Sequence, residues 1–194
     1  MNIHNFEWNE RCHFGNLNLK IPENSKILIL GPNGVGKTSF LREICFHKQH
    51  VEFESDFISS QSMYSSYQTT NSYLSVEESL KIIPLGDKKD FFQVSQFSKQ
   101  ALKNLSAGQL QRFWLHLAFN MQRKLLILDE PSVYLDYPSR KNLKFAIKNY
   151  PYNLFISSHE YEYFKDTMDY VLHLDFGTNS IYLMKDFEKQ GILK

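Results

Sequence analysis

Short apolar runs alternate with polar stretches that have helical spacing along most of the chain. Residues 17–21 alternate apolar and polar side chains, which predicts a half-buried strand. Three continuous apolar runs predict strands covered on both faces, at residues 27–30, 125–128 and 154–156. Apolar residues at helical spacing predict a helix over 106–123, and a further helix is expected over 139–149. Strands that alternate with helices indicate an α/β fold with a mainly parallel sheet.

The middle of the chain has a different composition. Residues 61–75 are rich in Ser, Tyr, Thr and Gln and poor in aliphatic residues, which predicts an exposed loop. Residues 76–104 are expected to form short helices broken at 84–86, where the sequence is Pro-Leu-Gly. The chain contains no internal repeats and no heptads.

Composition narrows the class of protein. A chain of 194 residues is large enough for a single domain with a real core. The net charge is only +1 and lysine far exceeds arginine, so we expect no nucleic-acid partner. The two cysteines, Cys12 and Cys45, lack metal-ligand spacing and indicate free thiols in a reducing compartment. Without an apolar leader or spanning run, we expect a cytoplasmic protein that reaches a membrane only through a partner.

A phosphate-binding motif follows the first buried strand. The sequence matches G-x4-G-K-T over Gly31, Pro32, Asn33, Gly34, Val35, Gly36, Lys37, Thr38 and Ser39. The glycines let successive backbone N–H groups turn toward phosphate oxygens, and the helix that begins near Lys37 aims its positive end at the same point. Lys37 is predicted to contact the β and γ phosphates. Thr38 is the expected Mg²⁺ ligand, and Ser39 can donate to the α-phosphate. The motif predicts ATP and Mg²⁺ as ligands.

An acidic pair ends the second buried strand. Asp129 and Glu130 follow residues 125–128 directly. Ligands of open α/β sheets bind at the carboxyl ends of strands, so Asp129 is expected to reach the Mg²⁺. The side chain of Glu130 is expected to point to the opposite side from that of Asp129, and to orient or deprotonate the attacking water.

The stretch Leu-Ser-Ala-Gly-Gln-Leu-Gln-Arg at 105–112 identifies a family. Ser106 is a good N-cap and Gln109 occupies the third helical position, so the two form a capping box. The stretch also resembles the LSGGQ signature of ABC-type ATPases, placed as in that family just before the acidic strand. Other family motifs follow in order, with resemblances at Gln61 (the Q-loop), at 74–78 (Leu-Ser-Val-Glu-Glu), at 135–136 (the D-loop) and at His159 (the switch histidine).

The resemblance implies a fold and a mechanism. The fold is that of a P-loop NTPase of the ABC type, with a mainly parallel core, a trimmed antiparallel β subdomain and a small helical subdomain. Two copies would pack head to tail around two ATPs, and Ser106, Gly108 and Gln109 of one would meet the γ-phosphate held by the other. Asp136 would link the two sites, and His159 would act with Glu130 on the water and the γ-phosphate.

Two of the site assignments, the adenine-stacking residue and the Q-loop glutamine, each have an alternative residue. The family stacks adenine on an aromatic residue before the P-loop, and we expect Trp8 in this role, with Phe6 as the alternative. Gln61 is expected to sense Mg²⁺ and the attacking water after a strand at 57–58, and Gln68 is its competitor. Ala107 replaces the first glycine of the signature, which removes no catalytic group.

The expected organisation is one domain, with residues 1–61 and 105–194 as the RecA-like core and 62–104 as the helical subdomain. The resemblance implies an ATP hydrolase that forms a homodimer, or pairs with another ABC subunit, and powers a separate integral membrane transporter subunit. The alternative is a free-standing ABC ATPase that acts in cofactor assembly or a similar process. The compact size and LSAGQ weakly resemble the ATPases of haem exporters in cytochrome c maturation.

Overall fold

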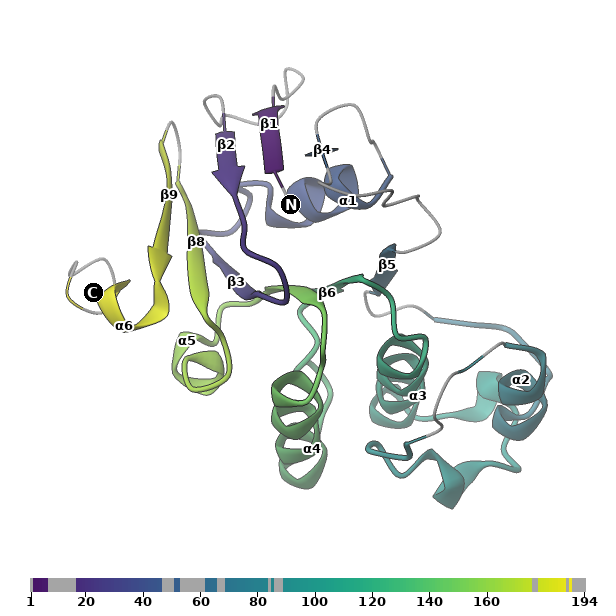
Figure 1. The fold of residues 1–194 in the computed structure, drawn as a ribbon. Helices are drawn as coiled ribbons and strands as arrows, with labels where there is room; N and C mark the ends of the chain where they lie inside the picture. The colour runs from purple at the N-terminus through teal and green to yellow at the C-terminus, as the bar shows by residue number, and fades with distance from the viewer. Residues whose placement is uncertain are drawn as a thin grey trace.

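The fold was obtained as a computed structural model, which describes residues 2–6, 17–46, 51–52, 62–65, 69–83, 85, 89–175, 178–187 and 189. Its centre is a six-stranded sheet in the order β5-β6-β7-β3-β8-β9 (Figure 1). The strands are β5 (Ser62–Ser65), β6 (Leu125–Asp129), β7 (Asn153–Ser157), β3 (Lys26–Leu30), β8 (Tyr170–Asp175) and β9 (Thr178–Leu183). All pairs are parallel except the β8–β9 hairpin. The predicted α/β class with a mainly parallel sheet is therefore confirmed.

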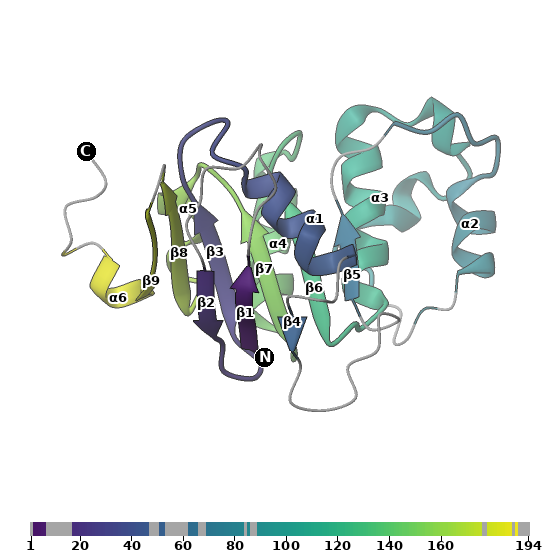
Figure 2. The same ribbon diagram turned by 90° about the horizontal axis from the view of Figure 1, so that it is seen from above.

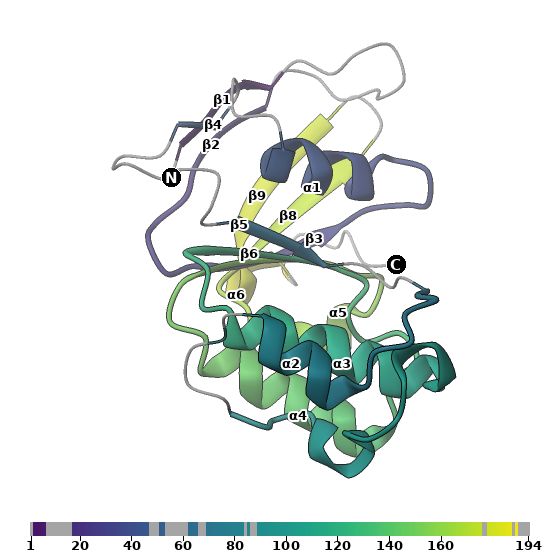
Figure 3. The ribbon, with the colours of Figure 1, turned by 90° about the vertical axis from the view of Figure 1, so that its right-hand side faces the viewer.

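Helices cover the sheet on both faces (Figures 1 and 3). One face carries α1 (Lys37–Phe46), together with an antiparallel sheet of β2 (Leu17–Lys20), β1 (Asn2–Phe6) and β4 (Val51–Glu52). The other face carries α3 (Ala107–Asn120), α4 (Tyr137–Lys148) and α5 (Tyr161–Phe164), and α6 (Met184–Phe187) follows β9.

Successive side chains of the buried strands point to opposite faces of the sheet, so the hydrophobic core forms two clusters, one on each face. Ile27 and Ile29 of β3 pack toward α1, whereas Leu28 and Leu30 pack toward the opposite helices. Strand β6 divides in the same way, because successive strand residues point to opposite faces. A strand that is buried on both faces must be apolar at every position, which explains its unbroken apolar sequence.

The helical lobe lies beside α3, at the β5 end of the sheet (Figure 2). It contains α2 (Val76–Ile82) and two 3₁₀ helices, Val94–Phe97 and Leu102–Asn104. Ser75 caps α2 through a capping box with Glu78. Arg112 of α3 donates to the Phe92 carbonyl at 2.7 Å and so ties the lobe to the core.

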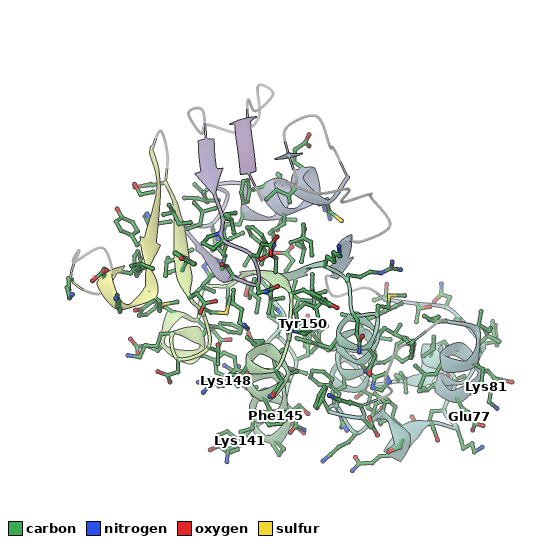
Figure 4. All side chains as sticks on the ribbon, in the orientation of Figure 1. Glu77, Lys81, Lys141, Phe145, Lys148 and Tyr150 are labelled. Carbon is green, nitrogen blue, oxygen red and sulfur yellow. The ribbon has the colours of Figure 1, made fainter. Side chains whose placement is uncertain are left out.

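Solvent-facing helix surfaces show the expected amphipathic pattern (Figure 4). On α2, Glu77 accepts from Lys81 at 2.8 Å, one turn apart on the outer side of the lobe. On α4, Lys141, Phe145 and Lys148 lie on the side away from the sheet, while Leu143, Ala146 and Ile147 are buried against it.

One expectation about the middle of the chain is wrong. We expected a loop over 61–75 and assigned 62–104 to the helical subdomain, but Ser62–Ser65 forms β5 and pairs in parallel with β6. These residues thus belong to the core sheet. The sequence Ser-Met-Tyr-Ser is too polar and too short to show a strand pattern by itself. Tertiary pairing with β6 overrides the weak local preference.

Candidate active site

The carboxyl ends of three neighbouring parallel strands meet at one edge of the sheet. The P-loop follows β3, Asp129 ends β6 with Glu130 directly after it, and Ser157 ends β7 shortly before His159. The register aligns Asp129 with Ser157. The predicted phosphate loop, acidic pair and histidine are therefore brought to the same edge, where ligands of open α/β sheets bind.

The P-loop has a backbone that requires glycine. Gly34 and Gly36 have φ values of 78° and 102°, in the region that side chains disfavour. At Gly31 a Cβ atom would lie 2.3 Å from the Leu174 carbonyl oxygen of β8, so the close approach excludes any side chain. The loop then enters α1, where the Phe40 N–H donates to the Gly36 carbonyl at 2.8 Å.

Lys37 bends back over the loop. Its Nζ donates to the Gly31 carbonyl at 2.8 Å and to the Pro32 carbonyl at 3.1 Å. Burial lowers the pKa of the Lys37 ammonium, and the carboxylates of Glu130 and Asp129 oppose that shift. The cation is thus held by weak neutral acceptors in a buried position, from which anionic phosphate oxygens are the better partners.

Thr38 and Asp129, two of the residues predicted to hold Mg²⁺, are hydrogen-bonded to each other. The Thr38 hydroxyl donates to Asp129 Oδ2 at 2.8 Å, and the buried Ser157 hydroxyl donates to the other carboxylate oxygen. One carboxylate and one hydroxyl are hard oxygen donors, which fit Mg²⁺ held mainly by phosphates and water. Among the described residues no group of three or more His, Cys, Asp or Glu converges, so a metal cage built from protein side chains alone is not found there.

Glu130 and His159 face each other. His159 Nε2 lies 3.4 Å from Glu130 Oε1, and the Ser158 hydroxyl donates to Glu130 Oε2 at 3.2 Å. Burial raises the pKa of the Glu130 carboxyl, and the nearby His159 and Ser158 oppose this only partly. Glu130 also has a left-handed backbone with φ 48°, anchored by its N–H to the Ser157 carbonyl at 3.0 Å. Such backbone strain in non-glycine residues is concentrated at functional sites.

The signature segment begins α3. Ser106 accepts from the Gln109 N–H at 3.2 Å, and the Gln109 side chain accepts from the Ser106 N–H at 3.0 Å, so the predicted capping box is present. Gly108 packs against the loop before α4, because a Cβ there would lie 2.8 Å from the Tyr134 carbonyl oxygen. Asp136 caps α4 by accepting from the Ser139 N–H at 2.9 Å. Hydrogen bonding to the side chain and then to the backbone of Ser139 lowers the pKa of the Asp136 carboxyl.

Two predicted site residues, Trp8 and Gln61, lie outside the described residues, as do the rival Gln68 and the strand expected at 57–58. The strand described in this region, β5, begins directly after Gln61. Its last residue, Ser65, pairs with Leu128, one position before Asp129. The carboxyl end of β5 is therefore level with that of β6, and in the sequence Gln61 precedes β5 whereas Gln68 follows it.

Sequence reasoning missed several polar residues around this edge. Ser157, the last residue of the apolar strand β7, and Ser158 directly after it are both fully buried, and Ser132 is buried in the turn after Glu130. Glu160 accepts hydrogen bonds from Ser132 and from Arg140. The signal available in the sequence is the Ser-Ser-His-Glu run, which places four polar residues directly at the carboxyl end of a buried strand.

Known ABC transporter proteins are similar to this chain in sequence. No protein-family model matches the chain. The sulfate/thiosulfate import ATP-binding protein CysA of Neisseria meningitidis serogroup A is 28% identical, in an alignment that covers 85% of this chain and 57% of that protein. The spermidine/putrescine import ATP-binding protein PotA of Clostridium acetobutylicum is 28% identical, in an alignment that covers 89% of this chain and 57% of that protein. The chain thus spans little more than half the length of these curated relatives.

A solved structure of the ATP-binding subunit of an ABC transporter superposes with a TM-score of 0.78 at 15% identity, covering 98% of this chain and 92% of the other. Among the described residues no helix has the length and apolar character needed to cross a bilayer. The chain is therefore a homologue of the ATP-binding proteins of ABC transporters and has the fold of their ATPase subunits.

Proposed function

We propose that this chain binds and hydrolyses ATP and thereby powers a separate membrane-spanning subunit of an ABC transporter. The observation that carries the proposal is the set of side chains at one edge of the sheet. Lys37 lies in the phosphate loop, Thr38 is hydrogen-bonded to Asp129, and Glu130 faces His159 at 3.4 Å.

ATP binding follows from the P-loop. The backbone N–H groups of the loop and the positive end of α1 receive the phosphates. The Lys37 ammonium exchanges the carbonyls of Gly31 and Pro32 for the β and γ phosphate oxygens. Thr38 and Asp129 would hold Mg²⁺, which, when bound, neutralises phosphate charge. Their mutual hydrogen bond keeps both oxygens in place for this role.

Hydrolysis follows from the pair beyond the metal ligands. Glu130 is positioned to orient the attacking water and to accept its proton, and burial already favours the protonated form of this carboxyl. His159 contacts the same carboxylate from the next strand and is positioned to contact the γ-phosphate. Glu130 would thus act on the attacking water, and His159 on the γ-phosphate that the water attacks.

A second copy of the chain, or a paired ABC subunit, completes the site. Ser106, Gly108 and Gln109 begin a 14-residue helix whose positive end suits a γ-phosphate held by another P-loop. Gly108 packs against Tyr134, two residues before Asp136 in the loop that leads to α4. A shift of the signature segment would therefore be passed to Asp136 through Tyr134.

The topology changes our choice for the glutamine. We now propose Gln68, rather than Gln61, as the residue that senses Mg²⁺ and the attacking water. The reason is the direction of β5, whose last residue is level with the end of β6. For adenine stacking we keep Trp8, with Phe6 as its rival.

The helical lobe is the proposed contact with the membrane partner. It carries the exposed apolar side chains of Tyr73 and Ile82, with exposed fractions of 79% and 70%. The import ATP-binding relatives support a transporter role. The chain would then lie on the cytoplasmic face of a membrane, held there by its partner.

ATP turnover tests the site. Lys37→Ala is expected to lose ATP binding and turnover, whereas Lys99→Ala, on the exposed lobe, is expected to retain both. Glu130→Gln is expected to bind ATP but hydrolyse it at least about 100-fold more slowly, since it removes a proton acceptor. Wild-type turnover in Lys37→Ala would show that the loop is not the ATP site.

Co-purification tests the partner. Tagged Glu130→Gln is isolated from its native cell with ATP, and Glu130→Gln/Lys37→Ala is the matched control that cannot bind ATP. An integral membrane protein in near-equal amount, reduced by Tyr73→Ser/Ile82→Ser, is the expected result. Recovery of soluble proteins alone would contradict the transporter role and favour a free-standing ABC ATPase.

A further inference from the structure

Two turns that carry the reacting side chains are tied together on both sides of His159. One turn, residues 130–132, follows β6, and the other, residues 158–160, follows β7. The phosphate loop and the metal ligands take no part in these ties. The contacts therefore have a role that ATP binding alone does not explain.

The first tie precedes His159. The Ser158 side chain is fully buried, at 0% exposure, and its hydroxyl donates to Glu130 Oε2 at 3.2 Å. The same hydroxyl accepts from the Glu160 N–H at 3.1 Å. One buried oxygen thus contacts both the reacting carboxylate and the backbone directly after His159.

The second tie follows His159. Glu160 Oε2 accepts from the Ser132 hydroxyl, and Ser132 is 1% exposed, two residues beyond Glu130. Glu160 Oε1 accepts from Arg140 Nη2 of α4 at 2.5 Å. These bonds, which outweigh the effect of burial, lower the pKa of the Glu160 carboxyl. The carboxylate is therefore charged near neutral pH and bridges the turn to the helix.

Arg140 is itself fixed. Its guanidinium carbon lies 4.2 Å from the centre of the Tyr163 ring, and the Tyr163 hydroxyl donates to the Arg140 carbonyl at 2.5 Å. A planar guanidinium that is both stacked and hydrogen-bonded keeps one orientation. Arg140 lies one turn after Asp136, the N-cap of α4, and its N–H donates to the Asp136 carbonyl at 2.9 Å.

We propose that Glu160 is a positioning residue for ATP hydrolysis. This inference rests on the proposed ATPase function. Glu160 holds the loop of His159 against the turn of Glu130 through Ser132, and it fixes both to the start of α4 through Arg140. The imidazole of His159 is about half exposed, with a side-chain exposure of 49%, so its position depends on the backbone that carries it. A side chain displaced by about 1 Å at a reacting centre can cost about 100-fold in rate.

The test compares Glu160→Ala with Glu162→Ala in the ATPase assay. Glu162 is an exposed acid two residues along the chain, with an exposure of 77% and an ion pair to Lys165 at 2.8 Å. Glu160→Ala is expected to lower kcat at least about 10-fold with KM for ATP within about 2-fold, because no ATP contact is removed. Glu160→Asp is expected to recover part of the rate, and Glu162→Ala to match the wild type.

A double-mutant cycle separates positioning from general destabilisation. If Glu160 acts through His159, adding Glu160→Ala to His159→Ala causes no further loss of kcat. Losses that multiply in the double variant would overturn the proposal, as would an unchanged kcat in Glu160→Ala. Circular dichroism confirms folding of each variant. If Glu160→Ala does not fold, Glu160→Gln, which keeps an acceptor for Ser132, replaces it in the cycle.

The ATP turnover rate of the wild type separates a failure of the proposed ATPase function from a failure of the positioning role of Glu160. A wild type without ATP turnover overturns the proposed function, and the role of Glu160 falls with it. A wild type that turns over ATP but is insensitive to Glu160 overturns only the positioning role.

Discussion

Replacement of Gly108 by alanine tests the packing of the signature segment against the loop before α4. A Cβ at this position would lie 2.8 Å from the Tyr134 carbonyl oxygen, closer than real Cβ atoms approach a backbone atom. Tyr134 has a left-handed backbone with φ 62°, so its peptide cannot move away easily. The substitution therefore forces a shift in the segment that leads to Asp136.

The magnitude follows from two opposing effects. Overpacking typically costs about 1–3 kcal/mol, whereas alanine is favoured over glycine in helices by up to about 1 kcal/mol. The helical preference is weaker in the first turn, where Gly108 lies, so the expected net loss is about 2 kcal/mol. For a chain of this size, that loss corresponds to a fall in Tm of about 4–8 °C.

The assay is thermal unfolding followed by circular dichroism, with Ala107→Gly as the matched control. Helix propensity alone predicts that Gly108→Ala raises Tm and that Ala107→Gly lowers it. The contact with Tyr134 reverses the sign for Gly108→Ala, and this variant should also turn over ATP more slowly. A Tm of Gly108→Ala equal to or above that of the wild type would refute the reasoning.

Three further predictions concern the loop, the lobe and acid stability. Gly31→Ala places a Cβ 2.3 Å from the Leu174 carbonyl oxygen. We therefore expect the variant to lose ATP binding in a binding assay and at least about 3 kcal/mol of stability in urea unfolding. Retained ATP affinity would contradict this prediction. Asn120 is buried and bonds the Lys89 N–H at 2.8 Å, the Lys89 carbonyl at 3.1 Å and the His116 carbonyl at 2.8 Å. Asn120→Leu is thus expected to cost about 2–3 kcal/mol in urea unfolding, and the exposed Asn104→Leu less than about 0.5; equal costs would show that these bonds do not matter. The pKa of Glu160 is lowered from 4.5, so its stabilising effect is complete above that pH and is lost as pH falls through the folded value. The stability difference between wild type and Glu160→Gln should shrink from about pH 7 to about pH 3 in urea titrations, and a constant difference would contradict the charged bridge.

Sequence patterns predicted the parts of the fold that local physics controls. Strands β3, β6 and β7 are buried on both faces, and their unbroken apolar runs made them visible. The capping box of Ser106 and Gln109 is a local interaction and was also predictable. The motifs at Lys37, Asp129 and Glu130 were placed correctly at one edge because they follow parallel strands.

Features set by distant partners were not predictable. Strand β5 depends on pairing with β6, and no periodicity within its four residues reveals it. The bonds from Ser132 and Arg140 to Glu160 join residues 28 and 20 positions apart. Nothing in the local sequence identifies such pairs. The role of Asp136 as the N-cap of α4 was locally readable but was hidden by the resemblance to the D-loop.

The strand order has a consequence for how stiffness is distributed. Strand β3, which supports the phosphate loop, has β7 on one side and β8 on the other, whereas β5 pairs with β6 alone among the described strands. Amide hydrogen exchange should therefore be slowest on β3 and faster toward β5. The predicted phosphate loop thus follows a strand that is paired on both sides, whereas the helical lobe joins the sheet beside the edge strand β5.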